Sequence, residues 1–256
     1  MSVVTCIESR HNPRFKTWQR YVARPDREDC PWLAVEGWKT VRDLSERQAP
    51  ELLIYADSDD PRLPSLLQKS KEAVEVTPDL FRRLSQVQHP QFILAFFSKP
   101  RWTWKQISPY VLYLDRLQDP GNFGTLIRTA AATGIFSVVA SPGTVSCFND
   151  KVVRASASCL LTSPFLQGVP FDELLKRNFT LWTTATTGGQ NLFEADFTSP
   201  LAVTIGGEAT GIDESIQAAA THRITIPMAA GVDSLNAGVA GSLIMYEVLR
   251  KQSQNE

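Results

Sequence analysis

The sequence predicts an α/β protein with two domains, and three observations lead to this prediction. Apolar strand-like runs alternate with helix-like patterns in both halves of the chain. Residues 98–109, with two prolines among charged and aromatic residues, interrupt that alternation and are typical of a linker. The 256 residues suffice for one large or two modest domains. We therefore expect one domain over residues 1–97, a linker over 98–109 and a second domain over 110–256.

The first half is expected to form a small α/β sandwich. Its apolar runs are "WLAVEG", "ELLIYA", "EAVEVT" and "FILAFF", and helix-like patterns separate them. These patterns predict helices near residues 12–24, 38–47, 63–69 and 78–85.

The second half alternates again, which predicts a mostly parallel sheet with helices on both faces. The expected strands are residues 110–115, 136–140, 179–185, 201–206 and 223–227. The expected helices are residues 122–133, 150–161, 171–177, 213–220 and 235–251. Ligands of such sheets bind beyond the carboxyl ends of the strands, which directs attention to the loops 119–124, 206–211 and 227–236.

Composition indicates an ordinary globular protein that is not embedded in a membrane. Apolar residues make up 43% of the chain and charged residues 21%, and no apolar run reaches membrane-spanning length. Four cysteines and three histidines are scattered without a C-x-x-C pair. We therefore expect no metal site and a reducing, cytoplasmic location.

The three loops and the helices that follow them carry polar residues that packing does not readily explain. A carboxylate inside a glycine-rich turn is one example, and an amide at the start of the last helix is another. Ser234 is the residue we expect to cap that helix, which leaves Asn236 free for other contacts. The full set of candidates is Asn122, Arg128, Glu208, Ser234 and Asn236.

Several enzyme classes lack their motifs in this chain. There is no G-x-S-x-G nucleophile elbow, no G-x-x-x-x-G-K-[ST] phosphate loop and no G-x-G-x-x-G fingerprint after the first strand of the second half. These absences disfavour serine hydrolases, phosphate-loop kinases and nucleotide-dependent oxidoreductases. These absences leave a group-transfer reaction in which the protein positions the reactants by hydrogen bonds and the transferred group comes from a donor that is already activated.

Three motifs, in this order, resemble those of the SpoU/TrmH-type RNA 2′-O-ribose methyltransferases of the SPOUT superfamily. They are "LDRLQDPGNFGTLIRTAAATG", "TIGGEATGID" and "IPMAAGVDSLNAGVA", and "DKVVRASA" adds to the likeness. The first half resembles the ribosomal-protein-like substrate-binding domain of the subgroup that acts on ribosomal RNA, through "SRHNPRFK", "LAVEG" and "LSQVQHPQFILAFF". Ala209, Ala237 and Gly238 depart from the family pattern, and these departures concern the shape of the pocket.

The resemblance implies a C-terminal trefoil knot, S-adenosylmethionine as methyl donor without a metal, and transfer to a ribose 2′-hydroxyl. It implies that Gly206, Ile226 and Leu235 hold the donor, with Thr186 as a weaker candidate. Arg128 is expected to act on the hydroxyl. Because an arginine is an improbable proton acceptor, we prefer a role in gripping phosphate and stabilising alkoxide charge, and whether it also takes the proton stays open. The other four polar candidates are expected to orient the ribose, Arg128 and the donor loop.

The expected substrate is structured RNA, with ribosomal RNA favoured over transfer RNA. Residues 1–105 hold 17 Lys and Arg against 14 Asp and Glu, although the whole chain has a net charge of −1. A basic cluster near the start is the candidate phosphate-binding surface, against the alternative of an ordinary solvated helix face. The residues are Arg10, Arg14, Lys16 and Arg20. The rival hypothesis for the whole chain is an RNA-binding module with a degenerate site.

The last helix predicts a homodimer through the second domain. Its apolar stripe consists of Leu235, Val239, Leu243 and Tyr246, and it shares the helix with small residues such as Gly238 and Gly241. Small residues allow close packing against another element. The resemblance implies that this element belongs to a second copy of the chain, whereas for a helix taken alone burial within the monomer is the commoner outcome.

Overall fold

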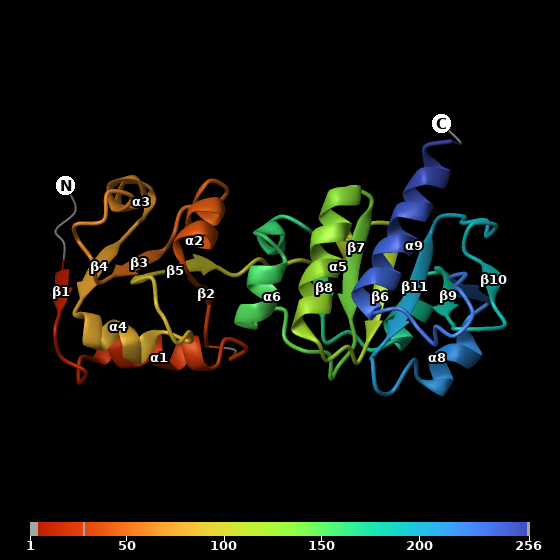
Figure 1. Cartoon of the computed structure of the whole chain (residues 1–256), viewed down its shortest axis with the longest axis horizontal. Coiled ribbons are helices and arrows are strands. Elements are labelled where there is room, and N and C mark those ends of the chain that lie inside the picture. Colours follow the sequence, from red (N-terminus) through yellow and green to blue (C-terminus); the bar gives the residue numbers. More distant parts are fainter. Residues whose placement is uncertain (1–4, 28, 255–256) are drawn as a thin grey trace. The chain divides into compact units, whose positions relative to one another are not determined.

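The computed structural model describes residues 5–27 and 29–254, and the chain forms two compact units, residues 1–100 and residues 101–256 (Figure 1). The division falls inside the stretch 98–109, whose role as a linker stays a prediction. That stretch includes the last residue of strand β5 (Ile93–Ser98) and a short 3₁₀ helix, η1 (Trp104–Gln106). No helix in the described ranges is long and apolar enough to cross a membrane.

The first unit is built on a five-stranded mixed sheet with the order β1-β4-β3-β5-β2. Strand β4 runs parallel to β1 and β3, whereas β5 is antiparallel to β3 and β2. Besides β5, the strands are β1 (Thr5–Ile7), β2 (Trp32–Glu36), β3 (Leu52–Tyr55) and β4 (Ala73–Val76). All except the three-residue β1 coincide with apolar runs identified in the sequence.

Helices cover both faces of this sheet (Figure 1). On one face, α1 (Pro13–Ala23) and α4 (Pro78–Leu84) pack against each other and against the strands. The core there joins Phe15, Trp18 and Phe81 to sheet residues such as Leu52 and Phe96. On the other face lie α2 (Trp38–Ser45) and α3 (Leu63–Lys69). The small α/β sandwich expected for the first half is therefore the architecture of this unit.

Helices α1 and α4 begin with the same local signal. The side chains of Asn12 and Thr77 accept hydrogen bonds from backbone N–H groups of the first turn, and a proline follows each cap. Proline suits that position because it lacks the N–H that would have no partner there.

The second unit contains a seven-stranded sheet in which every neighbouring pair is parallel, with the order β10-β12-β9-β11-β6-β7-β8. Strands β6 (Tyr110–Asp115), β7 (Phe136–Ala140) and β11 (Leu201–Gly206) have the predicted bounds. The remaining strands are β8 (Phe165–Gln167), β9 (Thr180–Thr184), β10 (Gln190–Asn191) and β12 (His222–Thr225). The predicted parallel α/β fold is confirmed.

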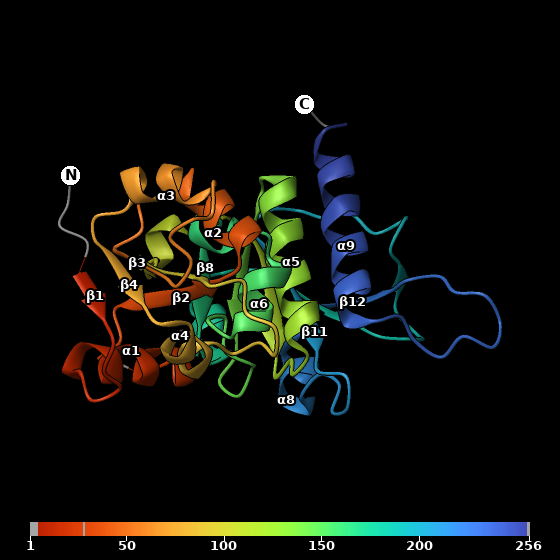
Figure 2. The ribbon, with the colours of Figure 1, turned by 60° about the vertical axis from the view of Figure 1, so that its left-hand side comes forward.

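Helices lie on both faces of the parallel sheet (Figure 2). One face carries α5 (Pro120–Thr133) and α9 (Ala237–Gln252), and α6 (Asp150–Ala155) packs against α5. The other face carries α7 (Asp172–Leu175) and α8 (Glu214–Ala219). Leu174 and Ile216 of these two helices share a core with Val111 and Tyr113 of β6.

Several helices differ from their predicted bounds, and the largest difference concerns residues 150–161. Residues 150–161 were expected to be one helix, but α6 ends at Ala155 and a 3₁₀ turn, η2 (Cys159–Leu161), follows. Ala157 and Ser158 have φ values of 48° and 70°, and this left-handed backbone ends the helix. The last helix begins at Ala237, two residues later than expected.

The small residues of α9 pack against α5 of the same chain, which corrects the partner-facing role expected for them. A Cβ atom on Gly241 would lie 2.5 Å from Leu126 Cδ2 on α5, so only glycine allows this approach. The hydroxyls of Thr129 and Ser242 lie 3.0 Å apart across the same contact. The helix pair therefore brings the start of α9 close to the start of α5.

Candidate active site

A pocket of about 400 Å³ lies where β9, β11 and β12 end. Its wall consists of residues that follow these strands, together with the first turn of α9. Apolar side chains predominate, namely Ile205, Ile212, Ile224, Ile226, Met228 and Leu235. The polar side chains include Thr184, Thr186, Glu208, Ser234 and Asn236. An apolar cavity with a few converging polar groups is typical of a binding site for a small organic ligand.

All four residues expected to hold the methyl donor line this pocket: Thr186, Gly206, Ile226 and Leu235. Gly206 is required by the backbone, because a Cβ atom there would lie 2.3 Å from the carbonyl carbon of Gly211. The sequence reasoning missed Ile205, Ile212, Ile224 and Met228. Their only signal was position. Ile205 and Ile224 are near the ends of strands, and Ile212 and Met228 lie in the segments that follow these strands.

Asn122 and Glu208 meet although 86 residues separate them in the sequence. The Asn122 Nδ2 group donates a hydrogen bond to Glu208 Oε1 at 2.6 Å. Asp119 caps α5 and accepts from the backbone N–H of Asn122 at 2.7 Å, so the first turn of α5 fixes where the amide lies. The bond joins the loop after β6 to the loop after β11, as the strand-end rule anticipates.

Asn236 lies close to this pair. A Cβ atom on Gly238 would lie 3.0 Å from Asn122 Oδ1 and 3.2 Å from Asn236 Oδ1, so the two amides flank the same glycine. Three of the five polar candidates, Asn122, Glu208 and Asn236, are therefore gathered at one side of the pocket.

Asn236, and not Ser234, caps the last helix. Its Oδ1 accepts from the backbone N–H of Val239 at 3.2 Å. The prediction that Ser234 is the cap, which left Asn236 free, is wrong, because the helix starts two residues later than expected. Ser234 instead lines the pocket from the exposed loop before the helix.

Arg128 does not line the pocket. It lies on the exposed side of α5, six residues after Asn122, which is about 9 Å further along the helix axis. Within the described residues, its guanidinium makes no hydrogen bond and no ion pair. The structure thus leaves this cation available to an anionic group from outside the chain.

No metal centre is apparent in the described part of the chain. Within residues 5–27 and 29–254, no group of three or more His, Cys, Asp or Glu residues is arranged to hold an ion. The polar groups of the pocket are amides, hydroxyls and one carboxylate, which suits recognition by hydrogen bonds.

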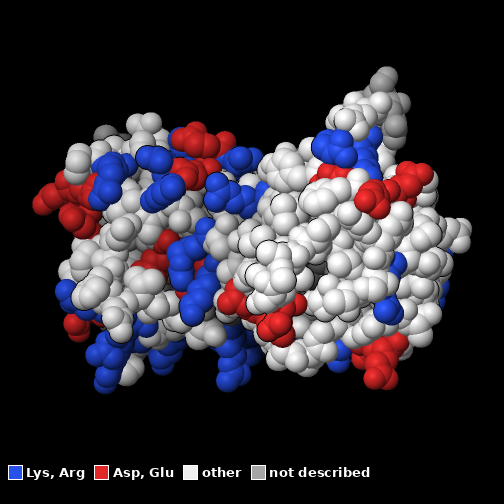
Figure 3. All heavy atoms as spheres, turned by 45° about the vertical axis from the view of Figure 1, so that its right-hand side comes forward, with Lys and Arg blue, Asp and Glu red and all other residues white. Residues whose placement is uncertain are grey.

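The four basic residues singled out in the first unit are all exposed, but they are not equally free. Arg14 pairs with Glu72 at 2.5 Å and Arg20 lies 3.5 Å from an Asp29 oxygen. Arg10 donates only to His11, and within the described chain Lys16 has no ion pair. In Figure 3 basic side chains project along the lower side of the first unit, the side on which α1 and α4 lie in Figure 1.

The apolar stripe of α9 is exposed, so the alternative of burial within the monomer does not hold. Val239, Leu243 and Tyr246 retain 48%, 41% and 51% of their accessible surface, whereas Leu235 is half-buried beside the pocket. Three large apolar side chains at intervals of four and three residues form one continuous face of the helix.

A parallel sheet with a strand-end pocket and a group of converging polar side chains defines the second unit as a ligand-binding α/β domain. The model of the SpoU rRNA Methylase family matches residues 109–246. The model of the MRM3-like substrate binding domain matches residues 12–95. Because the first match spans more than half of the chain, the protein belongs to the SpoU rRNA methylase family.

Individual relatives agree with this assignment. The 23S rRNA (guanosine(2553)-2'-O)-methyltransferase RlmP of Bacillus subtilis is 28% identical over 247 residues, covering 94% of this chain and 98% of that protein. An uncharacterized tRNA/rRNA methyltransferase of Synechocystis is 32% identical over 194 residues, covering 73% of this chain and 70% of that protein. The SpoU methyltransferase AviRb from Streptomyces viridochromogenes, solved with its cofactor AdoMet, superposes with a TM-score of 0.81 at 26% identity, covering 94% of this chain and 98% of that one.

Proposed function

We propose that the protein transfers the methyl group of S-adenosylmethionine to a ribose 2′-hydroxyl of RNA, and that the RNA is ribosomal. The observation that carries this proposal is the Asn122–Glu208 hydrogen bond beside a pocket that all four expected donor-binding residues line. The family, the RlmP relative and the AdoMet complex of AviRb point to the same reaction.

The pocket suits S-adenosylmethionine in size and chemistry. About 400 Å³ lies within the usual range for an organic ligand. Isoleucine, leucine and methionine side chains offer contacts to a flat adenine ring, and the loop after β11 offers backbone groups. When bound, this cofactor would supply a methyl group already activated on a sulfonium, and transfer would leave a neutral thioether. The chain orients the acceptor and stabilises its 2′-oxygen while the hydroxyl proton is lost to solvent.

Arg128 and the other four polar candidates have separate roles in the proposed reaction. The guanidinium of Arg128 grips an RNA phosphate and stabilises negative charge on the attacking 2′-oxygen. The Glu208 carboxylate holds the Asn122 amide in one orientation through their 2.6 Å bond. Asn236 and Ser234 then orient the ribose and the donor loop at the side of the pocket.

RNA affinity is assigned to Arg10, Arg14, Lys16 and Arg20, and the surface extends onto α4. Arg82 and Arg83 are exposed on that helix, and Gln19 of α1 donates to the Arg83 carbonyl, so the two helices form one surface. Helix α1 contains no acidic residue, and the single one on α4, Asp79, lies 3.9 Å from Arg82. Cations with few close counterions are suited to phosphate contacts.

Elsewhere on the first unit, three cations are held in close ion pairs. There Arg62 pairs with Asp60 at 2.5 Å, Lys69 with Glu46 at 2.5 Å and Lys71 with Glu51 at 2.8 Å. Paired in this way, these cations are already neutralised by carboxylates of the chain. The lack of acidic residues on α1 favours the α1–α4 surface, which we define as Arg14, Lys16, Arg20, Arg82 and Arg83, as the RNA-binding face.

A homodimer through the second unit is part of the proposal. The exposed α9 stripe supports it, since contiguous exposed apolar side chains mark interfaces. The C-terminal trefoil knot rests on the sequence resemblance. A cytoplasmic location is supported by the four cysteines, which are scattered through the sequence without a C-x-x-C pair.

One experiment tests the reaction and separates it from the degenerate-module hypothesis. The full chain is incubated with methyl-tritiated S-adenosylmethionine and either unmodified 23S ribosomal RNA transcript or a transfer RNA pool, in chelator. Nuclease digestion and mass spectrometry should then find 2′-O-methylnucleoside in the ribosomal RNA. Binding of RNA without transfer would support the degenerate module, and transfer to transfer RNA alone would overturn the choice of ribosomal RNA.

A further inference from the structure

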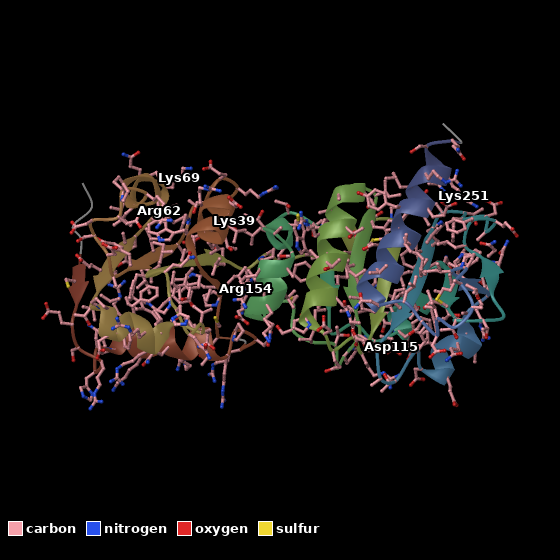
Figure 4. The ribbon with its side chains drawn as sticks, viewed as in Figure 1. Lys39, Arg62, Lys69, Asp115, Arg154 and Lys251 are labelled. Atoms are coloured by element: carbon pink, nitrogen blue, oxygen red, sulfur yellow. The ribbon has the colours of Figure 1, made fainter. Side chains whose placement is uncertain are left out.

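Asp115 holds both ends of the loop that carries Glu208. It is the last residue of β6, and only 5% of its side chain is exposed (Figure 4). Its carbonyl accepts from the Gly207 N–H at 2.9 Å, where the loop leaves β11. Its carboxylate Oδ2 accepts from the Asp213 N–H at 2.8 Å, where the loop enters α8. A single residue therefore fixes residues 207–213 at their beginning and their end.

Arg116 adds further contacts to Asp115 and to the end of the loop. We call Asp115 and Arg116 the clamp residues. The guanidinium of Arg116 donates to both carboxylate oxygens of Asp115 at 3.2 Å and lies 3.5 Å from the Asp213 carboxylate. Arg116 has a φ of 54°, a left-handed conformation that costs free energy for any residue except glycine. Its N–H donates to Ser141 Oγ at 2.9 Å, which stabilises that backbone.

The approach of the loop to Arg116 also requires glycine at position 207. A Cβ atom there would lie 2.7 Å from the Arg116 carbonyl oxygen. Between its two fixed ends, the loop closes on itself through the Gly211 N–H, which donates to the Gly207 carbonyl at 2.9 Å. The loop is therefore a small rigid turn seated on Asp115 and Arg116.

Neither clamp residue lines the pocket, but the loop they hold does. Gly206, Gly207, Glu208, Gly211 and Ile212 all contribute to its wall. Stability alone is a weak reason for a buried carboxylate such as that of Asp115, because desolvation offsets much of its attraction to Arg116. A role in holding Glu208 at one place explains why the pair sits directly behind this turn.

We propose that Asp115 and Arg116 are positioning residues of the methyl transfer. They hold residues 207–213 so that Glu208 reaches Asn122 and the loop forms its side of the cofactor pocket. Asp115 also begins the segment that leads into α5, which carries Asn122. It is therefore connected to Asn122 through the chain and to the Glu208 loop through hydrogen bonds. This inference rests on the proposed function and assigns further residues to its site.

A double-mutant cycle in the full chain tests the inference. Single-turnover transfer into unmodified 23S ribosomal RNA is measured at saturating S-adenosylmethionine for wild type, Asp115→Ala, Glu208→Gln and the double variant. If Asp115 acts through Glu208, Asp115→Ala slows wild type by roughly tenfold or more but slows Glu208→Gln by less than about threefold. Equal losses in both backgrounds would overturn the proposal. Calorimetry should also show weaker S-adenosylmethionine binding by Asp115→Ala.

Two further variants separate positioning from general instability. Glu247→Gln removes a carboxylate that is 8% exposed and paired with Arg250, but that contacts neither the loop nor the pocket. It should keep the transfer rate within about twofold of wild type. Asp115→Asn keeps the shape and an acceptor for the Asp213 N–H, so its loss should be smaller than that of Asp115→Ala. If Asp115→Ala does not fold, Asp115→Asn takes its place in the cycle.

The outcomes distinguish this inference from the proposed function. A wild-type chain that transfers no methyl group would contradict the function itself. A wild-type chain that transfers, combined with uncoupled Asp115 and Glu208 losses, would contradict only the clamp.

Discussion

The strand-end site of the second unit and the α1–α4 surface of the first unit use polar residues in opposite ways. At the strand ends, Asn122 and Glu208 are held by bonds to each other and to helix caps. On the α1–α4 surface, Lys16 and Arg83 are exposed and have no ion pair within the described chain. A site that orients a reacting group gains from rigid geometry, whereas phosphate contacts depend mainly on charge.

Arg128 shares features of both regions. It belongs to the second unit, but like Lys16 and Arg83 it is exposed. Replacing Arg128 by Ala should lower the single-turnover transfer rate by about 10²- to 10³-fold, the usual loss for a group that stabilises transition-state charge. Its distance from the pocket predicts that S-adenosylmethionine affinity changes by less than about twofold. Arg128→Lys, which keeps the charge without the two-pronged donor, should fall in between. A near-normal rate for Arg128→Ala would remove this residue from the mechanism.

Because the loops at the strand ends are rigid, adding a single methyl group to one of their glycines should have a large effect on cofactor binding. Gly206→Ala should weaken S-adenosylmethionine binding by about tenfold or more, because its Cβ would collide with the Gly211 backbone. RNA affinity should remain unchanged. Gly134→Ala, at the end of α5, is the control for strained backbone, since φ is 71° there and nothing lies within 4 Å of the added atom. Calorimetry on both variants checks the prediction, and equal losses would contradict it.

The α9 stripe of the second unit is exposed and apolar, whereas the α1–α4 surface of the first unit is basic, and the stripe therefore predicts a protein partner. Leu243→Asp combined with Tyr246→Asp should convert a dimer into a monomer in analytical ultracentrifugation at micromolar concentration. Phe193→Asp, at another exposed apolar residue, should leave the dimer intact. A wild-type chain that is monomeric and active at this concentration rules the dimer out.

Because the α1–α4 surface is expected to bind RNA through charge and not through fixed geometry, removing its cations should have a graded, salt-dependent effect on RNA affinity. Lys16→Gln combined with Arg83→Gln should lower the slope of log affinity against log salt by about 1.4 to 1.8, from roughly 0.7 to 0.9 for each phosphate contact. Lys39→Gln combined with Arg47→Gln provides the matched control, because both residues lie outside the α1–α4 surface and have no ion pair within the described chain. If both pairs change the slope equally, the α1–α4 surface has no special role.

The smallest expected effect concerns a carboxylate of the second unit that serves stability alone. The hydrogen bond from Arg250 holds the pKa of the Glu247 carboxyl below its ordinary value of 4.5. Because the folded pKa is lowered, this stabilisation is present above pH 4.5 and is lost as pH falls through the folded value. Urea denaturation of wild type and Glu247→Gln should differ by roughly 1 kcal/mol at neutral pH, and the difference should shrink below pH 4.5. A difference independent of pH would contradict this.

The fold was largely predictable, for reasons visible in particular elements. Strands β6, β7 and β11 are unbroken apolar runs because both faces of a central parallel strand are buried, and their bounds were predicted correctly. Strands β8 and β10, of three and two residues, are too short to leave a pattern. The break between α6 and η2 depends on a backbone conformation at Ala157 and Ser158 that no residue type there signals.

The site was predictable as a set of loops but not as a set of contacts. The rule that ligands bind beyond the carboxyl ends of the strands predicted that the loops of Asn122 and Glu208 lie close together. It could not predict the hydrogen bond between these two side chains or the helix cap formed by Asn236. Gly241 was recognised as a position of close approach, but whether α5 or a second chain approaches it depends on tertiary packing. Asp115 was read only as the end of a strand, because its role depends on a loop almost a hundred residues further along.

The central claim is that the second unit transfers a methyl group to RNA ribose and that Arg128 is required for this transfer. Mass spectrometry of nucleosides from 23S ribosomal RNA, treated with methyl-labelled S-adenosylmethionine and either wild type or Arg128→Ala, tests it most directly. The account predicts label on a ribose 2′-oxygen with wild type, little with the variant, and equal cofactor binding by both. Label on a base, or equal labelling by the two proteins, would contradict it.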